Sequence, residues 1–237
     1  MKRFGYGILL LTGLITGLVS PGYSEVETMG RSYFIFGINR VKLNQFNRVL
    51  NDTGYPKFSD SLTSIGGAGW GMEKRLVLGG EGYYLKGQER NIEGYTLSLA
   101  GGAGFFNIGY LLFSGSHLNL YPVVGIGGGR LSFDITGEQT ETFDNILHDP
   151  GKSVSLKTGG FLLNFSLTVD YLVPVFEGID ELGEETGLAV GLRVGYVFDP
   201  TPGDWTANKI ANITGGPELG ITGPYIQLLL GPGSNTR

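Results

Sequence analysis

The stretch Phe161-Leu-Leu-Asn-Phe-Ser-Leu-Thr-Val-Asp-Tyr-Leu-Val-Pro174 decides the fold class of this chain. Its odd positions are apolar throughout, and its even positions include Asn164, Ser166, Thr168 and Asp170. A hydropathy period of two is typical of a β-strand with two different faces. Leu188–Phe198 repeats the pattern, with large apolar residues on one face and Ala189, Gly191, Arg193 and Gly195 on the other.

Six further segments show the same alternation less purely. They are Ser32–Ile38, Leu62–Met72, Arg75–Leu85, Ile92–Phe113, Leu118–Ile135 and Tyr225–Leu230. The sequence therefore predicts about eight strands. Within Ile92–Phe113 the apolar positions change from odd to even across Gly101–Gly104, which we interpret as a β-bulge that shifts the phase by one residue.

Longer and shorter connections broadly alternate along the chain. In an up-and-down antiparallel arrangement this places the longer loops at one end of the molecule, as in transmembrane β-barrels. The first long connection contains Val41–Leu50, whose apolar residues have helical spacing, with Asn39 as a possible cap and Gly54 just beyond the end. This short amphipathic helix is expected either on the rim or over the mouth of a barrel, or packed on its own loop.

Two arguments indicate which strand face points outward. The less apolar face carries Asn, Ser, Thr, Ala and Gly with few charges, whereas a soluble barrel would cover its exterior with charged residues. An eight-stranded barrel also has an interior just wide enough for side chains, which large apolar residues from every strand would overfill. The sequence therefore predicts an all-β protein, a closed antiparallel up-and-down transmembrane β-barrel with its apolar face in lipid.

The amino-terminal segment predicts export. Lys2 and Arg3 precede an apolar run from Ile8 to Val19, and Pro21-Gly-Tyr-Ser24 offers a cleavage site. The run is too short to span a bilayer as a helix. We therefore expect residues 1–24 to be a cleaved export signal peptide and residues 25–237 to form a single outer-membrane barrel domain.

Composition excludes several classes of site. The chain has no cysteine and only two histidines, so thiol chemistry, disulfides and iron–sulfur centres are excluded and a histidine-rich metal site is nearly so. Its net charge of −5, without a basic cluster, disfavours nucleic-acid binding. Ser116-His117 and His148-Asp149 are hydrolase-like pairs, and neither has a visible partner in the sequence. We expect no enzymatic activity, catalytic residue, cofactor or metal.

Two charges lie on strand faces assigned to the lumen. If Phe176 faces Gly187 in their hairpin, Asp170 and Arg193 become direct cross-strand neighbours. The sequence thus suggests a structural charge pair between Asp170 and Arg193 inside the barrel, in preference to two separately solvated charges near its mouth. Such a network would obstruct the lumen.

The signal, the eight alternating segments and the absence of cysteine together resemble the small outer-membrane β-barrel proteins of diderm bacteria. Leu188–Phe198 and Gly223–Leu230 are similar to the last two strands of such barrels. Members of this family commonly end on an aromatic residue, whereas this chain continues through Gly231–Arg237. The resemblance also implies aromatic girdles, and nine aromatics near predicted strand ends are candidates for them: Tyr33, Trp70, Tyr83, Tyr84, Tyr95, Tyr121, Tyr171, Tyr196 and Phe198.

The expected function is a structural or surface-interaction role in the outer membrane, carried by external loops. The expected partners are outer-membrane lipid and an envelope or surface protein, and the chain is expected to be a monomer. Two alternatives stay open. One is a narrow channel or a carrier of hydrophobic ligands, and the other is a soluble periplasmic lipocalin-like binder, which would need its apolar faces inward.

Overall fold

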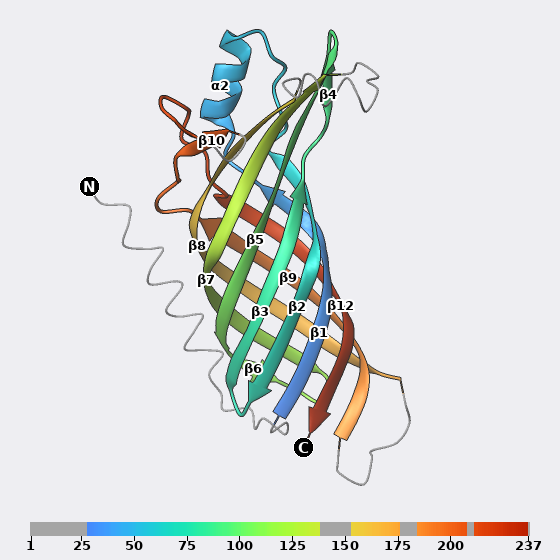
Figure 1. Cartoon of the computed structure of the whole chain (residues 1–237). Coiled ribbons are helices and arrows are strands. Elements are labelled where there is room, and N and C mark those ends of the chain that lie inside the picture. The colour runs from blue at the N-terminus through green and yellow to red at the C-terminus, as the bar shows by residue number, and fades with distance from the viewer. Residues whose placement is uncertain (1–27, 138–152, 176–183, 208–210, 237) are drawn as a thin grey trace, which may run out of the picture.

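A computed structural model describes residues 28–137, 153–175, 184–207 and 211–236. The expected export signal, residues 1–24, lies outside these residues. The structure is a closed, eight-stranded, antiparallel up-and-down barrel, which confirms the predicted fold class (Figure 1). Its wall consists of β1 (Thr28–Arg40), β2 (Ser61–Glu73), β3 (Leu76–Lys86), β5 (Tyr95–Tyr110), β7 (Leu118–Gly137), β8 (Ser153–Pro174), β9 (Glu184–Phe198) and β12 (Gly223–Thr236).

The two ends of the barrel differ. One end, called here the loop end, carries the helix α2 (Asn44–Asp52) and the short strands β4 (Arg90–Ile92), β10 (Trp205–Ala207) and β11 (Ala211–Ile213) (Figure 1). The other, called the turn end, carries the tight β2–β3 turn and the two-residue strand β6 (Phe113–Ser114). Among the described residues, no helix is long and apolar enough to cross a membrane.

The stagger of the strands follows from their register. A path of cross-strand partners that starts at Met29 of β1 and passes once around the wall returns to β1 at Asn39, ten residues further along the strand. The chain of partners is Met29, Met72, Val77, Gly109, Val123, Ser166, Gly195, Tyr225 and Asn39. With about 3.3 Å per residue and about 4.8 Å between strands, this stagger tilts the strands by about 40°, as usual for barrels.

The wall closes between the first and last strands. β1 pairs with β12 from Thr28 opposite Thr236 to Asn39 opposite Tyr225. The pairing is interrupted at Ser32–Tyr33 and Gly231–Pro232, where proline lacks the N–H that the ladder needs. Residues 231–236 therefore belong to the last strand, whereas the sequence suggested a tail beyond Leu230.

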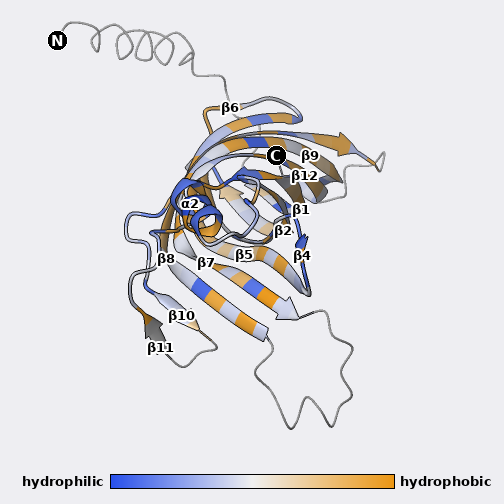
Figure 2. Ribbon diagram, turned by 90° about the horizontal axis from the view of Figure 1, so that it is seen from above, coloured by the Kyte–Doolittle hydropathy of each residue, from blue (hydrophilic) through white to orange (hydrophobic). Residues whose placement is uncertain are grey.

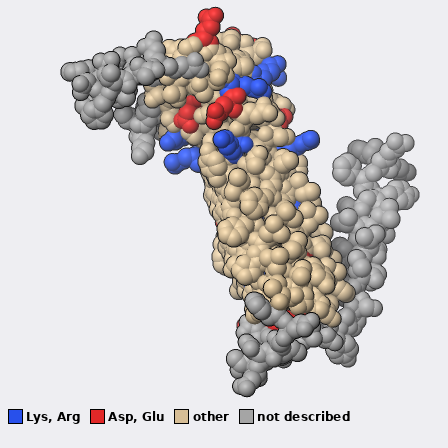
Figure 3. Space-filling model, turned by 90° about the vertical axis from the view of Figure 1, so that its right-hand side faces the viewer, with Lys and Arg blue, Asp and Glu red and all other residues tan. Residues whose placement is uncertain are grey.

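Large apolar side chains of the strands point outward over most of the barrel height. Phe165 and Leu192 are 47% and 50% exposed, while the alternate residues Asp170 and Arg193 are 1% and 0% exposed. The hydropathy colours alternate along the strands accordingly (Figure 2). A broad uncharged band results, with charged residues gathered at the loop end (Figure 3). The outward assignment of the apolar face is therefore confirmed.

β5 corrects the predicted bulge. Its register with β3 and β7 is unbroken, so Gly101–Gly104 do not shift the phase. Leu97 and Leu99 instead face the lumen at the loop end, whereas Phe106 and Ile108 face outward lower down. The apolar residues change sides because the upper lumen has an apolar core, while the lower wall has an apolar exterior.

Four outward glycines lie directly side by side on four adjacent strands. Gly67 pairs with Gly82, Gly82 with Gly104, and Gly104 with Gly128. A Cβ at any of these positions would meet only ordinary or open space, no atom lying nearer than 3.4 Å. On the lumen side, by contrast, a Cβ on Gly66 or Gly127 would overlap a neighbouring strand's backbone. Neighbouring strands therefore approach too closely for a side chain at Gly66 and Gly127, whereas the outer glycine row leaves the backbone uncovered.

Candidate functional site

Four charged side chains from the wall are buried in the lumen. They are Arg31 of β1, Glu81 of β3, Asp170 of β8 and Arg193 of β9, each at most 8% exposed. Arg31, Glu81 and Asp170 are the only charges on the inward faces of their strands, whereas Arg193 shares the inward face of β9 with Glu185 at the turn end. Unpaired, each would carry a large desolvation cost.

The central pair joins opposite walls of the barrel. The Arg193 guanidinium contacts the Glu81 carboxylate, and β3 and β9 are separated by three strands in either direction around the wall. The Asn164 amide donates to Oε1 of Glu81 at 3.1 Å, and the Tyr225 hydroxyl donates to Oδ1 of Asn164 at 2.8 Å. The guanidinium also lies 4.7 Å from the centroid of the Trp70 ring, a cation–π contact. These groups form a layer across the lumen.

A second pair lies nearer the turn end. Nε of Arg31 is 3.6 Å from Oδ1 of Asp170, which also accepts a hydrogen bond from the Asn119 amide at 3.0 Å. The Arg31 guanidinium donates to the Ser234 carbonyl at 2.6 Å and to the Asn235 side chain at 2.7 Å. Arg31 thereby ties β1 to the last strand as well as to β8.

The expected direct pair between Asp170 and Arg193 needs correction. Both residues are buried in the lumen, but the β8–β9 register is two residues away from the expected one. Arg193 lies opposite Thr168, and Asp170 lies opposite Gly191. A shift of two residues keeps each side chain on its own face, so alternation alone does not reveal it. Each charge instead has its own partner, Glu81 for Arg193 and Arg31 for Asp170.

An apolar core fills the lumen above the central pair, beneath α2. Phe46 of α2 stacks on Trp205 at 6.0 Å and meets the edge of Phe133 at 5.2 Å. Leu97, Leu131 and other inward residues of the wall join the same cluster. The helix predicted in the first long connection is therefore confirmed, and it lies over the mouth of the barrel. Its N-cap is Leu43, whereas the suggested cap, Asn39, is a buried residue of β1.

A second apolar cluster fills the lumen at the turn end. It contains Met29, Met72 and Leu172 from three strands of the wall, and Leu111 from the connection after β5. Together with the two charged layers and the upper core, it places buried side chains in the lumen at both ends and between them.

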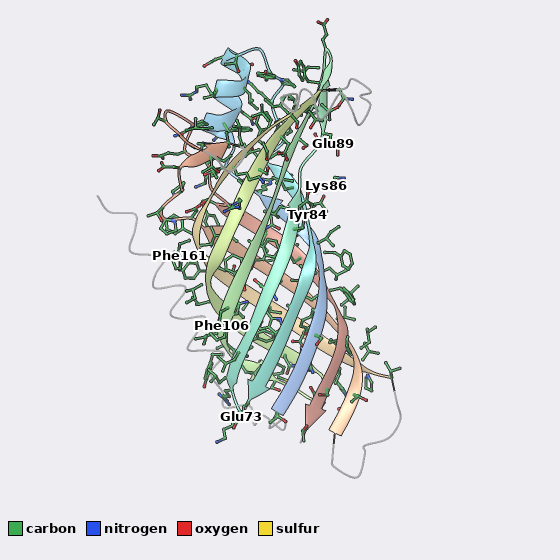
Figure 4. The ribbon with its side chains drawn as sticks, in the orientation of Figure 1. Glu73, Tyr84, Lys86, Glu89, Phe106 and Phe161 are labelled. Carbon is green, nitrogen blue, oxygen red and sulfur yellow. The ribbon has the colours of Figure 1, made fainter. Side chains whose placement is uncertain are left out.

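The aromatic candidates divide into two groups. Tyr84, Tyr171, Tyr196 and Phe198 point outward and are exposed, whereas Tyr95 is exposed at the loop end but lies on the same face of β5 as the inward Leu97. Tyr33, Trp70, Tyr83 and Tyr121 are instead buried in the lumen, so these four candidates do not contribute to a girdle. Tyr84, Phe106 and Phe161 are among the outward aromatics of the band (Figure 4).

Of the two hydrolase-like pairs, only Ser116-His117 lies among the described residues. Nε2 of His117 lies 2.9 Å from Oε1 of Glu185 at the turn end, and His148-Asp149 lies outside the described residues. The part of the chain that the structure describes contains no group of three potential metal ligands. Beyond the wall, burial raises the pKa of the Asp199 carboxyl. The Thr201 N–H donates a hydrogen bond to this carboxyl, which lowers the pKa but does not cancel the effect of burial.

No protein-family model matches the chain, and no curated protein matches it. The fold and the site therefore define its class by themselves. It is an eight-stranded antiparallel barrel with an apolar exterior band and a lumen filled by buried ion pairs between two apolar clusters.

Proposed function

We propose that this protein is an outer-membrane β-barrel with a structural or surface-interaction role. The observation that carries the proposal is the uncharged exterior band on a closed barrel (Figure 3). A closed barrel satisfies its backbone hydrogen bonds within the wall, as a lipid environment requires. A soluble binder would instead bury the residues that this barrel exposes, such as Phe34 at 66% exposure.

The filled lumen favours a structural role over transport. A channel needs a continuous polar path, yet the Glu81–Arg193 layer and both apolar clusters cross the interior. The loop end carries the additional elements outside the wall, α2, β4, β10 and β11, and surface loops commonly carry function. Interaction with an envelope or surface partner is accordingly assigned to that end.

Fractionation of cells that express the full chain tests the membrane location. We expect recovery with outer membranes and a gel mobility that changes on heating, because the closed barrel should resist unfolding in detergent. Release with soluble periplasmic protein would contradict the proposal. Bilayer recordings of the purified protein should show no steady conductance, and a large stable conductance would favour the channel.

The absence of cysteine allows a direct test of orientation. Glu89 at the loop end and Glu73 at the turn end are both exposed glutamates and are marked in Figure 4. In intact cells, Glu89→Cys should react with a membrane-impermeant maleimide, whereas Glu73→Cys should react only after permeabilisation. The reverse labelling pattern would place the loop end in the periplasm.

A further inference from the structure

The upper border of the apolar band carries a set of outward cations. Arg40 follows Ile38 on the outer face of β1, and Lys86 follows Tyr84 on that of β3. Arg130 follows Gly128 on β7, and Lys157 lies two outward positions above Phe161 on β8. These four residues, called here the basic girdle, are the first outward charges met above the band on their strands.

The sign of the charge changes with distance from the band. On β7, the outward acid Asp134 lies two outward positions beyond Arg130, further from the band. On the face shown in Figure 3, the charged atoms nearest to the uncharged surface at the loop end belong to Lys and Arg, and acidic atoms lie beyond them. The girdle therefore presents positive charge where an apolar surface meets the aqueous loop end.

Arg130 and Lys157 form the densest part of the girdle. Arg130 pairs with Gly159 and Ser132 pairs with Lys157, so the two cations are diagonal neighbours on one face of the β7–β8 ladder. Such diagonal neighbours lie about 7–8 Å apart, and like charges on one sheet face repel. Among the described residues, neither has an ion-pair partner within 4.0 Å. Asp134 is a diagonal neighbour of Lys157 on the same face, but Arg130 has no acidic neighbour on β5 or β8, so an anion can be held there by Arg130 with Lys157 beside it.

The surroundings of this pair fit a ligand with an apolar part. Gly102 is the partner of Arg130 on β5, and Gly128 and Gly159 are its outward neighbours on β7 and β8, so no bulky side chain covers these positions. Below them begins the apolar band, with Phe161 opposite Gly128. An anion held by the two cations would thus lie directly above an apolar surface.

We propose that the basic girdle, with Arg130 and Lys157 at its centre, binds the phosphate headgroup of anionic lipid in the leaflet at the loop end. This inference rests on the proposed membrane location. Cations at a membrane border attract anionic lipid, and each Lys or Arg near such a surface contributes a factor of about five to binding. A phosphate oxygen accepts hydrogen bonds from arginine and lysine, and the acyl chains would lie against the outward glycines and Phe161.

Native mass spectrometry of the full chain in detergent tests the inference. The protein is offered phosphatidylglycerol and phosphatidylcholine with identical acyl chains at equal concentration. We expect the wild type to retain mainly phosphatidylglycerol. In the variant Arg130→Gln with Lys157→Gln, the ratio of bound phosphatidylglycerol to phosphatidylcholine should fall about 25-fold, because two such contributions are lost.

The matched control is Arg48→Gln with Lys57→Gln, which removes one Arg and one Lys at the same end but outside the wall. Its lipid ratio should stay within about twofold of the wild type if the girdle acts locally. Equal losses in both variants, or no preference in the wild type, would overturn the inference. Displacement of phosphatidylglycerol by an equal concentration of inorganic phosphate would also overturn it, by showing a site for free anions.

Insertion into neutral phosphatidylcholine vesicles separates this inference from the proposed function. The wild type and both variants should insert and show heat-modifiable mobility. A wild type that fails to insert contradicts the proposed function itself. A wild type that inserts but binds both lipids equally contradicts the lipid-binding inference alone.

Discussion

The Glu81 carboxylate and the Arg193 guanidinium meet in the middle of the barrel from strands on opposite walls. The pair therefore acts as a crossbar that links β3 to β9 without involving the strands between them. Because both side chains are 0% exposed, the two charges depend on each other and on Asn164 for compensation.

Removing one member of the central pair should destabilise the barrel more than removing both. Glu81→Gln or Arg193→Gln alone leaves a buried charge unpaired, which costs about 3–5 kcal/mol, whereas the double variant leaves none. Urea unfolding in lipid vesicles measures this coupling. The exposed pair of substitutions Glu73→Gln and Lys74→Gln is the control, and its effects should be additive and small. Additive effects at Glu81 and Arg193 would refute the crossbar.

The second ion pair predicts a specific pattern of coupling. Arg31→Gln and Asp170→Asn should be non-additive, because these side chains contact each other. Asp170→Asn combined with Arg193→Gln should come much closer to additivity, because each charge has a different partner. A full set of double-mutant cycles by urea unfolding distinguishes the two cases. Stronger coupling for Asp170 with Arg193 than with Arg31 would restore the pair that the sequence suggested.

A charge in the apolar band should impair insertion. Leu192→Arg places a guanidinium on the outer face near the middle of β9, which costs about 2–4 kcal/mol at the midplane of a bilayer. Insertion is measured by the fraction of protein with heat-modifiable mobility after mixing with vesicles. Thr136→Arg, outward on β7 above the girdle, is the matched control and should insert normally. Normal insertion of Leu192→Arg would argue against lipid around the band.

The helix over the mouth should depend on one aromatic residue. Phe46→Ala removes the ring that contacts Phe133 and Trp205, and such a truncation in a core typically costs about 3–5 kcal/mol. We expect faster hydrogen exchange in α2 with little change in β9, because the charged layers below remain. Val49→Ala, on the exposed side of the same helix, should have little effect. Equal exchange in the two variants would show that α2 is held by its own loop.

Asp199 predicts a local pH dependence. Burial raises the pKa of its carboxyl in the folded protein, so the folded state holds the proton more tightly than the unfolded state. Its contribution to stability is therefore fully present below the ordinary pKa of aspartate and is lost as pH rises through the raised value. Asp199→Asn should remove this part of the pH dependence and stabilise the protein at neutral pH. A steeper pH profile in the variant would contradict this assignment.

The alternation of the sequence was sufficient for the eight wall strands, because it is a local period of two. Their outward face needed two further observations, the small uncharged residues of the other face and the narrow interior of an eight-stranded barrel. Register was harder, since the two-residue shift in the β8–β9 ladder leaves the faces of Asp170 and Arg193 unchanged. The true partners, Arg31 and Glu81, carry the same signal as Asp170: a lone charge on the inward face of a strand. Which lone charges meet depends on the stagger around the whole barrel, which no single segment encodes.

The β5 strand shows the other limit of sequence interpretation. Its change of apolar phase is real, but it marks the depth at which an apolar lumen gives way to an apolar exterior. A bulge and such a change of surroundings look the same in a hydropathy pattern. Only the unbroken ladders to β3 and β7 distinguish them.

The closure between β1 and β12 also has a consequence for the order of assembly. Contacts across it, such as that of Arg31 with Asn235, join residues 204 positions apart in the chain. β1 is the first strand of the wall to be made and β12 is the last, so one edge of β1 has no neighbour until β12 has been made. Contacts of such long range form slowly, and an open strand edge invites pairing with other chains. This barrel is therefore most vulnerable to aggregation before β1 pairs with β12, when its hairpins can already have formed but the wall is still open.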